Sequence, residues 1–522
     1  MAAWLADFAA LCRRLVATSG RLEKRRLVAD YLRALPSGDV ATAVAFLTGR
    51  AFPASDPRTL GVRGPVFAAT PASATSPPPT LADVAAAFSA VAEASGTGSR
   101  RAREEILGAL AARATPQERD VLGRVIGGEM RTGVSDGLVL EAVAEAARVD
   151  VAAVRRATLF LGDLATVAAL ALTGGAVALT GVGPRPFVPL LPMLAEIAHD
   201  FDEALAAHGG RTALEYKYDG ARIQLHWDGA RVGIWTRRLS DVTRSLPDVV
   251  AVARRDLRHA PLILDGEVVA LDAAGRPLPF QELMRRFRRV HDVEALAAAM
   301  PLALHFFDCL LAGGRALIDE PYTRRWEALA AATEGRYLAE RAIVTAVAEA
   351  TAFRALALAA GHEGVMAKDL ASAYEPGGRG KRWFKLKVPQ TVDCVIVAAD
   401  RGSGRRVGWL SNYHLAVGDG DGFAEVGKTF KGLTDREFGA MTERLRALAT
   451  GDDGYTVSVR PEVVVEVEYN EIQRSPTYPS GLALRFARIA RIRDDKGPGQ
   501  ATTLGELRGL YEGQFGTKGR LV

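Results

Sequence analysis

The chain has 522 residues, which at about 150 residues per domain predicts three domains rather than one. Hydrophobic residues make up 48% and charged residues 24%, so the composition excludes wholesale disorder, collagen and coiled coil, while the net charge of +5 is too mild to identify a nucleic-acid partner by itself. The cysteines lie too far apart in sequence for a disulfide framework or a four-cysteine zinc site, and a reducing compartment fits them best: Cys12, Cys309 and Cys394.

The first part of the chain, residues 1–185, has the pattern of an all-α domain. Apolar residues recur at spacings of three and four over Asp83–Ala94 and Ser99–Arg113, with charged residues between them. Ser135 or Asp136 has the side chain and the position to cap a following helix. We therefore expect several packed helices here.

Two stretches interrupt this helical pattern. Residues 53–79 are rich in proline, serine, threonine and glycine, which is typical of a loop or an internal linker. The uncharged run Leu164–Pro184 has the length of a membrane span, but Gly174-Gly175 divides it near its middle. Buried helices joined by a glycine turn explain the run more simply, and we expect no membrane segment.

The middle part, residues 186–390, mixes strand and helix patterns. Residues alternate in polarity over Arg222–Trp235 on both sides of Asp228-Gly229, which predicts a β-hairpin. Leu262–Leu271 predicts a second hairpin with its turn near Ala274-Gly275, and Tyr322–Ala332 and Asp292–Ala299 have helical spacing. An α+β domain is the expected result.

The last part, residues 391–522, predicts a small β-barrel. Val392–Ala398 is mostly apolar and β-branched, and further strand patterns follow around Leu415, Phe423 and Val457–Val467. The segment Leu484–Lys496 carries four arginines and a lysine. Such a segment is either a solvated basic face or an element that faces phosphate.

Lysine is scarce, at ten residues among 66 basic ones. A coding bias that replaces surface lysine by arginine explains the ratio, and the lysines that remain then include those whose chemistry arginine cannot perform. An amine can become a nucleophile, whereas a guanidinium does not deprotonate in proteins. This argument singles out Lys217 and the pair Lys385 and Lys387.

Four short segments carry the remaining chemistry. Glu267 is a carboxylate within an apolar strand pattern, where an unpaired charge is costly and a ligand, metal or basic partner is needed. Alternation places Lys385 and Lys387 on one strand face, where two ammonium groups repel each other unless an anion such as phosphate lies between them. The segments are Lys217-Tyr218-Asp219-Gly220, Asp265-Gly266-Glu267, Glu363-Gly364-Val365-Met366-Ala367-Lys368 and Trp383-Phe384-Lys385-Leu386-Lys387.

In this order and at these spacings the segments resemble the motifs of the covalent nucleotidyltransferase superfamily, and specifically of the ATP-dependent DNA ligases. The resemblance extends over nearly the whole chain, from Glu129–Ser135 to Arg485–Lys496. The departures are Ala487, where the family commonly has proline, and Phe430-Lys431-Gly432 after Gly427-Lys428, where relatives often have a different turn.

The resemblance implies a fold and an activity. The expected fold is an all-α N-terminal DNA-binding domain (1–185), an α+β, ATP-grasp-like nucleotidyltransferase domain (186–390) and a C-terminal OB-fold barrel (391–522), with a hinge near Val388–Thr391. The expected enzyme is a cytoplasmic, monomeric DNA ligase for replication, repair and recombination. It uses ATP and Mg²⁺ to seal nicks in double-stranded DNA through a lysyl-AMP intermediate and releases AMP and diphosphate.

The resemblance also assigns roles to single residues. Lys217 is the nucleophile, Glu215 recognises the adenine edge largely through its backbone, and Phe307 stacks on the ring. Glu363 is the main metal carboxylate, and Glu267 contacts the ribose or assists with the metal. Phosphates are assigned to Arg222, Arg237, Arg379, Lys385 and Lys387, and orientation of the leaving pyrophosphate to Arg493, Asp495 and Lys496.

Three other interpretations use the same residues. An RNA ligase or an mRNA-capping guanylyltransferase shares the lysine motif, but the large helical part before Lys217 argues against both. The NAD-dependent ligases need four cysteines for zinc, and this chain has three. A non-catalytic nick-binding protein would not need the full set of charged residues.

Overall fold

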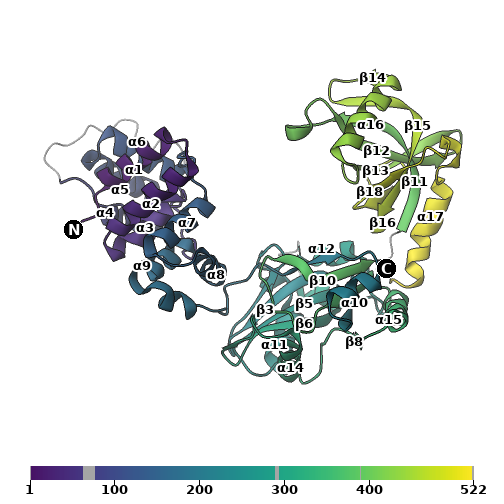
Figure 1. Ribbon diagram of the computed structural model, residues 1–522, viewed down its shortest axis with the longest axis horizontal. Coiled ribbons are helices and arrows are strands. Elements are labelled where there is room, and N and C mark those ends of the chain that lie inside the picture. The colour runs from purple at the N-terminus through teal and green to yellow at the C-terminus, as the bar shows by residue number, and fades with distance from the viewer. Residues whose placement is uncertain (1, 63–76, 288–292, 388–389, 520–522) are drawn as a thin grey trace.

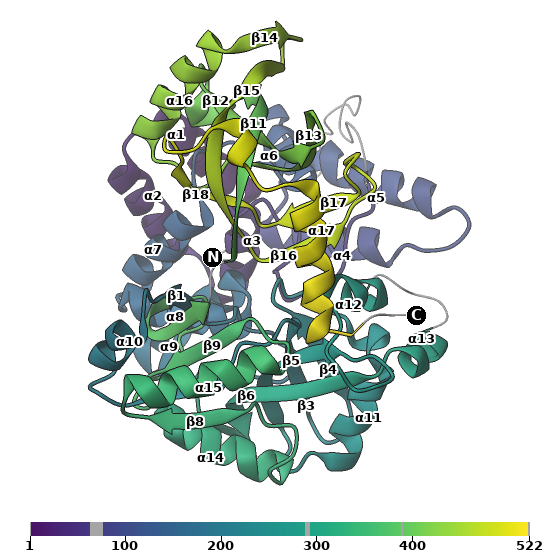
Figure 2. The ribbon, with the colours of Figure 1, turned by 90° about the vertical axis from the view of Figure 1, so that its right-hand side faces the viewer.

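The computed structural model describes residues 2–62, 77–287, 293–387 and 390–519. Figure 1 shows a helical region, a mixed α/β region and a β-rich region in chain order, and Figure 2 shows helix α17 running from the β-rich region toward the mixed one. Most of the predicted loop after Pro53 and the predicted hinge residues Val388 and Pro389 lie outside the described residues.

The N-terminal region is helical, as the sequence predicts. The predicted helix Ser99–Arg113 forms with these same bounds, and Ser135 caps the helix after it by accepting a hydrogen bond from the Leu138 backbone N–H. The helices pack around one apolar core that includes Phe8, Phe46 and Phe88. They are α1 (Leu5–Ala17), α2 (Arg21–Ala34), α3 (Val40–Leu47), α4 (Leu81–Glu93), α5 (Ser99–Arg113), α6 (Pro116–Gly127), α7 (Asp136–Ala147), α8 (Val151–Leu161) and α9 (Leu164–Thr180).

The uncharged run forms helix α9, which breaks at Gly175. That residue has φ 58° and ψ −150°, a conformation open to glycine because it has no Cβ. Ala165, Val167 and Ala168 are buried in the helical core. Among the described residues, no helix has both the length and the apolar character needed to cross a bilayer.

The mixed region contains two five-stranded sheets with strand orders β1-β10-β9-β2-β8 and β4-β3-β5-β6-β7. Helices α11 and α14 cover the core face of the second sheet, and α10 and α15 cover that of the first. The elements are β1 (Leu194–Ile197), α10 (Phe201–Ala207), β2 (Thr212–Tyr216), β3 (Ala221–Trp227), β4 (Val232–Thr236), α11 (Pro247–Asp256), β5 (Leu262–Ala270), α12 (Phe280–Phe287), α13 (Val293–Ala299), β6 (Leu302–Ala312), β7 (Arg315–Ala316), α14 (Tyr322–Thr333), β8 (Arg341–Val344), α15 (Val347–Ala359), β9 (Gly364–Lys368) and β10 (Arg379–Lys387).

The chain turns at both predicted positions, Asp228-Gly229 and Gly275, but only the first turn joins two paired strands. Strands β3 and β4 pair as the expected hairpin around Asp228-Gly229. Gly275 turns the chain after β5, but the returning arm is only an isolated bridge between Leu271 and Pro277 before α12 begins. The main partners of β5 are instead β3 and the distant strand β6.

The C-terminal region is β-rich. Its long strands β11 and β15 pair antiparallel with register shifts, and β12, β13, β14 and β18 extend the sheet on either side. One core, which includes Tyr413, Phe438 and Val465, fills the space between the sheet and helix α16. The elements are β11 (Gln390–Arg401), β12 (Leu410–Asp419), β13 (Gly422–Thr429), α16 (Asp435–Ala447), β14 (Ala449–Asp452), β15 (Thr456–Tyr469), β16 (Glu471–Arg474), β17 (Leu482–Arg485), β18 (Arg488–Ile492) and α17 (Leu504–Gly513).

Candidate active site

Lys217 lies where the chain leaves one sheet of the mixed region and enters the other. It follows β2, and β3 begins four residues later. Its backbone N–H donates to the Gly364 carbonyl (2.9 Å), and its own carbonyl accepts from the Glu363 N–H (3.0 Å). A Cβ on Gly220 would lie 2.3 Å from the Val268 carbonyl oxygen, so only glycine fits after Asp219 in this turn. The backbone therefore fixes Lys217 beside Glu363.

The amine of Lys217 donates to Glu363 Oε2 at 2.5 Å, and Lys387 forms an ion pair with the same oxygen. Burial alone would raise the pKa of Glu363, but Lys217 and Lys387 together outweigh it and lower that pKa to about 2. Burial and the neighbouring Lys217 lower the pKa of Lys387. One carboxylate thus holds two amines in place.

Strand β10 supplies the other lysine of the predicted pair. Phe384 and Leu386 are buried in the core beneath the sheet, so Lys385 and Lys387 share the opposite face, as predicted. No hydrogen bond or ion pair joins the side chain of Lys385 to the described residues. Burial, then Lys387 and Arg379, lower the pKa of Lys385. Its amine is available to an anion from outside the chain.

Glu267 and Arg222 face each other across β5 and β3. Burial raises the pKa of Glu267 to about 8, although Lys217 and Arg222 act against this. Arg222 donates to both oxygens of Asp265 (2.9 and 2.6 Å) and to the Met193 carbonyl (2.7 Å). The guanidinium predicted to hold phosphate therefore already has protein acceptors.

Arg237 and Arg379 are exposed, and they differ in their contacts. Arg379 donates to the Ala195 carbonyl at 3.1 Å. Arg237 has no hydrogen bond or ion pair with the described residues, and partial burial, Arg222 and Arg379 lower its pKa. Both remain candidates for phosphate contacts.

Glu215 and Phe307, the predicted adenine contacts, share a partner that the sequence analysis did not use. Lys368 is 1% exposed, and its Nζ lies 2.6 Å from Glu215 Oε2 and 4.4 Å from the Phe307 ring centroid. Tyr322 donates its hydroxyl to the other oxygen of Glu215. Lysine scarcity was a signal that could have identified Lys368.

The C-terminal region reaches this site through residues other than the predicted ones. Lys518 Nζ donates to Asp219 Oδ2 (2.6 Å) and to Glu471 Oε1 (3.2 Å), and Arg485 forms an ion pair with Glu471 (3.3 Å). Sequence analysis missed Lys518, although it too is one of the ten lysines.

The predicted pyrophosphate residues lie in the β-rich region and contact each other. Arg493 pairs with Asp495 at 2.7 Å and with Asp393 at 3.3 Å, and Lys496 pairs with Asp393 at 2.5 Å. Neither Asp495 nor Asp393, their partners in these ion pairs, belongs to the mixed region. The structure therefore does not bring these three residues together with Lys217.

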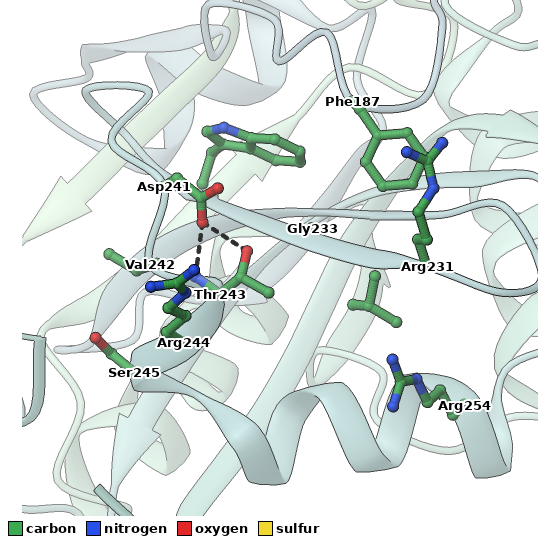
Figure 3. Close-up of a pocket in the computed structure, with 11 residues that line it drawn as sticks. Phe187, Arg231, Gly233, Asp241, Val242, Thr243, Arg244, Ser245 and Arg254 are labelled. Atoms are coloured by element: carbon green, nitrogen blue, oxygen red, sulfur yellow. Dashed lines mark hydrogen bonds between the residues drawn. The ribbon is translucent and has the colours of Figure 1, made fainter. Parts of the chain in front are cut away.

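A separate hollow of about 660 Å³ lies beside β4 and the segment Asp241–Ser245 that follows it (Figure 3). Phe187 and Trp235 line it together with Arg231, Arg244 and Arg254. No residue that the sequence assigns to the reaction lines this hollow. The catalytic assignment therefore rests on the charged cluster around Lys217 and not on this hollow.

Comparison with known proteins gives a consistent result. Family models match residues 192–387 (ATP dependent DNA ligase domain), 406–496 (ATP dependent DNA ligase C terminal region) and 66–144 (DNA ligase N terminus). A probable DNA ligase of Anaeromyxobacter dehalogenans is 48% identical over 98% of this chain and 100% of its own length. DNA ligase 1 of Korarchaeum cryptofilum is 41% identical over 98% of this chain and 99% of its own length.

Among solved structures, one named Pmar-Lig_PreS3 matches 93% of this chain and 99% of its own length, with a TM-score of 0.51 at 18% identity. This likeness concerns the fold. Identities of 48% and 41% over 98% of the chain, together with the family model, establish that the chain belongs to the ATP-dependent DNA ligase family.

Proposed function

We propose that Lys217 is the nucleophile through which this member of the ATP-dependent DNA ligase family seals nicks in duplex DNA. The observation that carries the proposal is the hydrogen bond of 2.5 Å between the Lys217 amine and Glu363, next to Lys385 and Lys387. A lysine is protonated at neutral pH unless its surroundings favour the free amine. The neighbouring cations Lys385 and Lys387 offset charge that develops on a phosphate, and Glu363 accepts the hydrogen bond of the Lys217 amine.

The first step forms one bond and breaks one. The Lys217 nitrogen attacks the α-phosphorus of ATP, and the bond from that phosphorus to the bridging oxygen breaks, so that pyrophosphate leaves. Glu363 is the acceptor nearest to the proton that the amine loses. Lys385, Arg237 and Arg379 would hold the phosphate oxygens, and Arg222 would support the site through its hydrogen bonds to Asp265. AMP then passes to the 5′-phosphate of the nick, and attack by the 3′-hydroxyl releases AMP.

Mg²⁺ is the metal that we propose for this site. Among the described residues no group of three or more histidine, cysteine, aspartate or glutamate side chains forms a ready metal cage. Mg²⁺ commonly binds one or two carboxylates together with substrate phosphates and waters, and Glu363 and Glu267 offer such hard oxygen ligands. When bound, Mg²⁺ would neutralise charge on the phosphates.

For the architecture we propose boundaries at 185/186 and 390/391. The antiparallel sheet of β11, β12, β13 and β15 supports an OB-fold for the last unit, and the two five-stranded sheets support an ATP-grasp-like form for the middle one. The pyrophosphate roles of Arg493, Asp495 and Lys496 would then require the last unit to move from its present contacts. We also propose a monomer that acts in the cytoplasm.

The DNA contacts should be mainly to phosphates, because a ligase must act on any sequence. Such binding releases counterions and weakens steeply as salt increases. We expect the affinity for a nicked duplex to fall about a thousandfold between 50 and 200 mM salt if about six phosphates are contacted. A salt-independent affinity would contradict this part of the proposal.

The experiment for the main proposal is to incubate the protein with ATP and Mg²⁺ and to measure its intact mass. The wild type should gain one AMP, and Lys217→Ala should gain none. Lys217→Arg keeps the charge but has no nucleophilic amine, so it should also gain none. If either variant gains AMP as the wild type does, Lys217 is not the nucleophile.

A further inference from the structure

The buried amine of Lys368 has no assigned task in the reaction above. Lys368 ends strand β9 and is 1% exposed, and Glu215 on the neighbouring strand β2 is 2% exposed. In the pairing of β2 with β9, Ala213 lies opposite Lys368, and Glu215 follows Ala213 by two residues on β2. The two side chains form an ion pair of 2.6 Å.

Three further contacts join the amine to the predicted stacking residue Phe307 and to Trp383. Lys368 Nζ donates to the Phe307 carbonyl at 3.2 Å, and it lies 4.4 Å from the Phe307 ring centroid and 4.3 Å from that of Trp383. Cations within about 6 Å of an aromatic centroid are attracted by the ring. One ammonium group therefore contacts the carboxylate of Glu215, the backbone of Phe307 and its ring.

The pair is a poor candidate for a purely stabilising role. Burying two charges costs several kcal/mol per ion, and replacing a buried ion pair by apolar residues is often neutral or stabilising. The pair includes one predicted base-binding residue, Glu215, and contacts the other, Phe307, so a role in nucleotide binding explains its retention better than stability does. Glu215 lies near the end of strand β2, two residues before Lys217.

We propose that Lys368 is a positioning residue that makes the site select a purine with a 6-amino group over one with a 6-oxo group. The inference rests on the proposed function and on Glu215 and Phe307 as the predicted base contacts. It assigns the contact of Glu215 to its carboxylate, whereas the family resemblance implies a contact largely through the backbone. Lys368 does not touch the base. It acts by holding Glu215 and Phe307 in place.

The chemistry of the carboxylate explains the selection. Lys368 contacts one oxygen of Glu215, and the hydroxyl of Tyr322 donates to the other, so both oxygens are fixed in orientation as acceptors. Adenine presents an amino donor at position 6, and guanine presents a carbonyl acceptor there. A fixed acceptor accepts a hydrogen bond from the first and repels the second. Sites built on such hydrogen bonds reject the wrong partner strongly, because their buried polar groups are then left unpaired.

The test compares ATP and GTP in Lys368→Met, Glu215→Gln and the double variant. Methionine has a similar length and no charge, and the double variant removes both buried charges, so that folding does not depend on an unpaired one. Binding of each nucleotide is measured by calorimetry on the Lys217→Ala background, where no covalent step occurs. AMP or GMP adducts are measured by intact mass with Lys217 present.

We expect Lys368→Met to lower the ratio of ATP affinity to GTP affinity at least about tenfold, because ATP binds more weakly and GTP more tightly than in the wild type. The double variant should lower it no more than Glu215→Gln alone, because Lys368 acts through Glu215. If the role of Lys368 is purely structural, Lys368→Met weakens the binding of ATP and of GTP equally and leaves the ratio of the two affinities unchanged. That result would overturn the inference. Effects of the two single variants that multiply would overturn it as well.

The two proposals can fail separately. A wild type that forms no AMP adduct refutes the role of Lys217, while the calorimetric ratio still tests Lys368. A wild type that forms the adduct, together with a Lys368→Met ratio equal to that of wild type, refutes only the inference on Lys368.

Discussion

Replacing Arg325 by methionine should destabilise the mixed α/β region strongly. Arg325 on helix α14 and Asp308 on strand β6 are both 0% exposed, and two hydrogen bonds of 2.7 and 3.0 Å join them. The same guanidinium donates to the carbonyls of Glu320 (2.6 Å) and Ser372 (2.7 Å). Asp308 directly follows Phe307, so this network holds the strand that carries the predicted stacking ring.

The size of the expected loss of stability follows from the burial of Arg325 and Asp308. Removing one partner of a buried ion pair leaves an uncompensated charge and costs about 3–5 kcal/mol. For a unit of about 150–250 residues each kcal/mol lowers the melting temperature by about 2–4 °C, so Arg325→Met should lower it by about 6–20 °C. Calorimetry of the full chain measures the transition of this region.

The control is the double variant Arg325→Met with Asp308→Asn, which removes both charges. It should be no less stable than the worse single variant, because the penalty comes from the charge left alone. The reasoning is refuted if the two single effects simply add, or if Arg325→Met changes the melting temperature by less than about 2 °C.

Three further predictions concern pH, phosphate and the C-terminal contact. Burial lowers the pKa of His226 to about 3 from its ordinary 6.5, so between these values the unfolded chain binds a proton that the folded chain does not, and stability should fall by about 1.4 kcal/mol per pH unit as pH decreases. Melting curves from pH 7.5 to 5 check this, and His226→Gln should reduce the slope while the exposed His199→Gln should not. Lys385→Ala should slow adduct formation about a hundredfold without lowering the melting temperature, because its amine has no partner among the described residues. Lys518→Ala should lower the hydrogen-exchange protection of α17, because it removes the ion pair with Asp219.

Each of these has a contradicting result. An unchanged slope in His226→Gln would show that another group takes up the proton. A Lys385→Ala enzyme with wild-type adduct formation would remove that residue from the phosphate contacts. Unchanged exchange of α17 in Lys518→Ala would show that other contacts hold the C-terminal segment.

Local patterns predicted local structure well. The 3.6-residue spacing over Ser99–Arg113 gave a helix with those bounds, and Asp228-Gly229 gave a hairpin. After Gly275 only a short returning arm forms, because β5 finds its partner in β6, beyond α12 and α13. Pairing between distant strands depends on tertiary packing, which a local pattern does not contain.

The same limit applies to the site. Order and spacing identified Lys217, Glu363 and Lys387, but the shared oxygen that joins the three groups appears only when β2, β9 and β10 become neighbours. The contact between Lys518 and Asp219 joins residues 299 positions apart, and no motif predicts it. Lysine scarcity, followed through all ten residues, would have pointed to both Lys368 and Lys518.

The central claim is that one amine, at position 217, bonds to phosphorus. Mapping the modified peptide after incubation with ATP and Mg²⁺ tests it most directly, since fragmentation assigns the AMP group to a single side chain. The account predicts a phosphoramidate on Lys217 alone. An adduct on Lys385, Lys387 or any other residue, or no covalent adduct in a preparation that seals nicks, would contradict it.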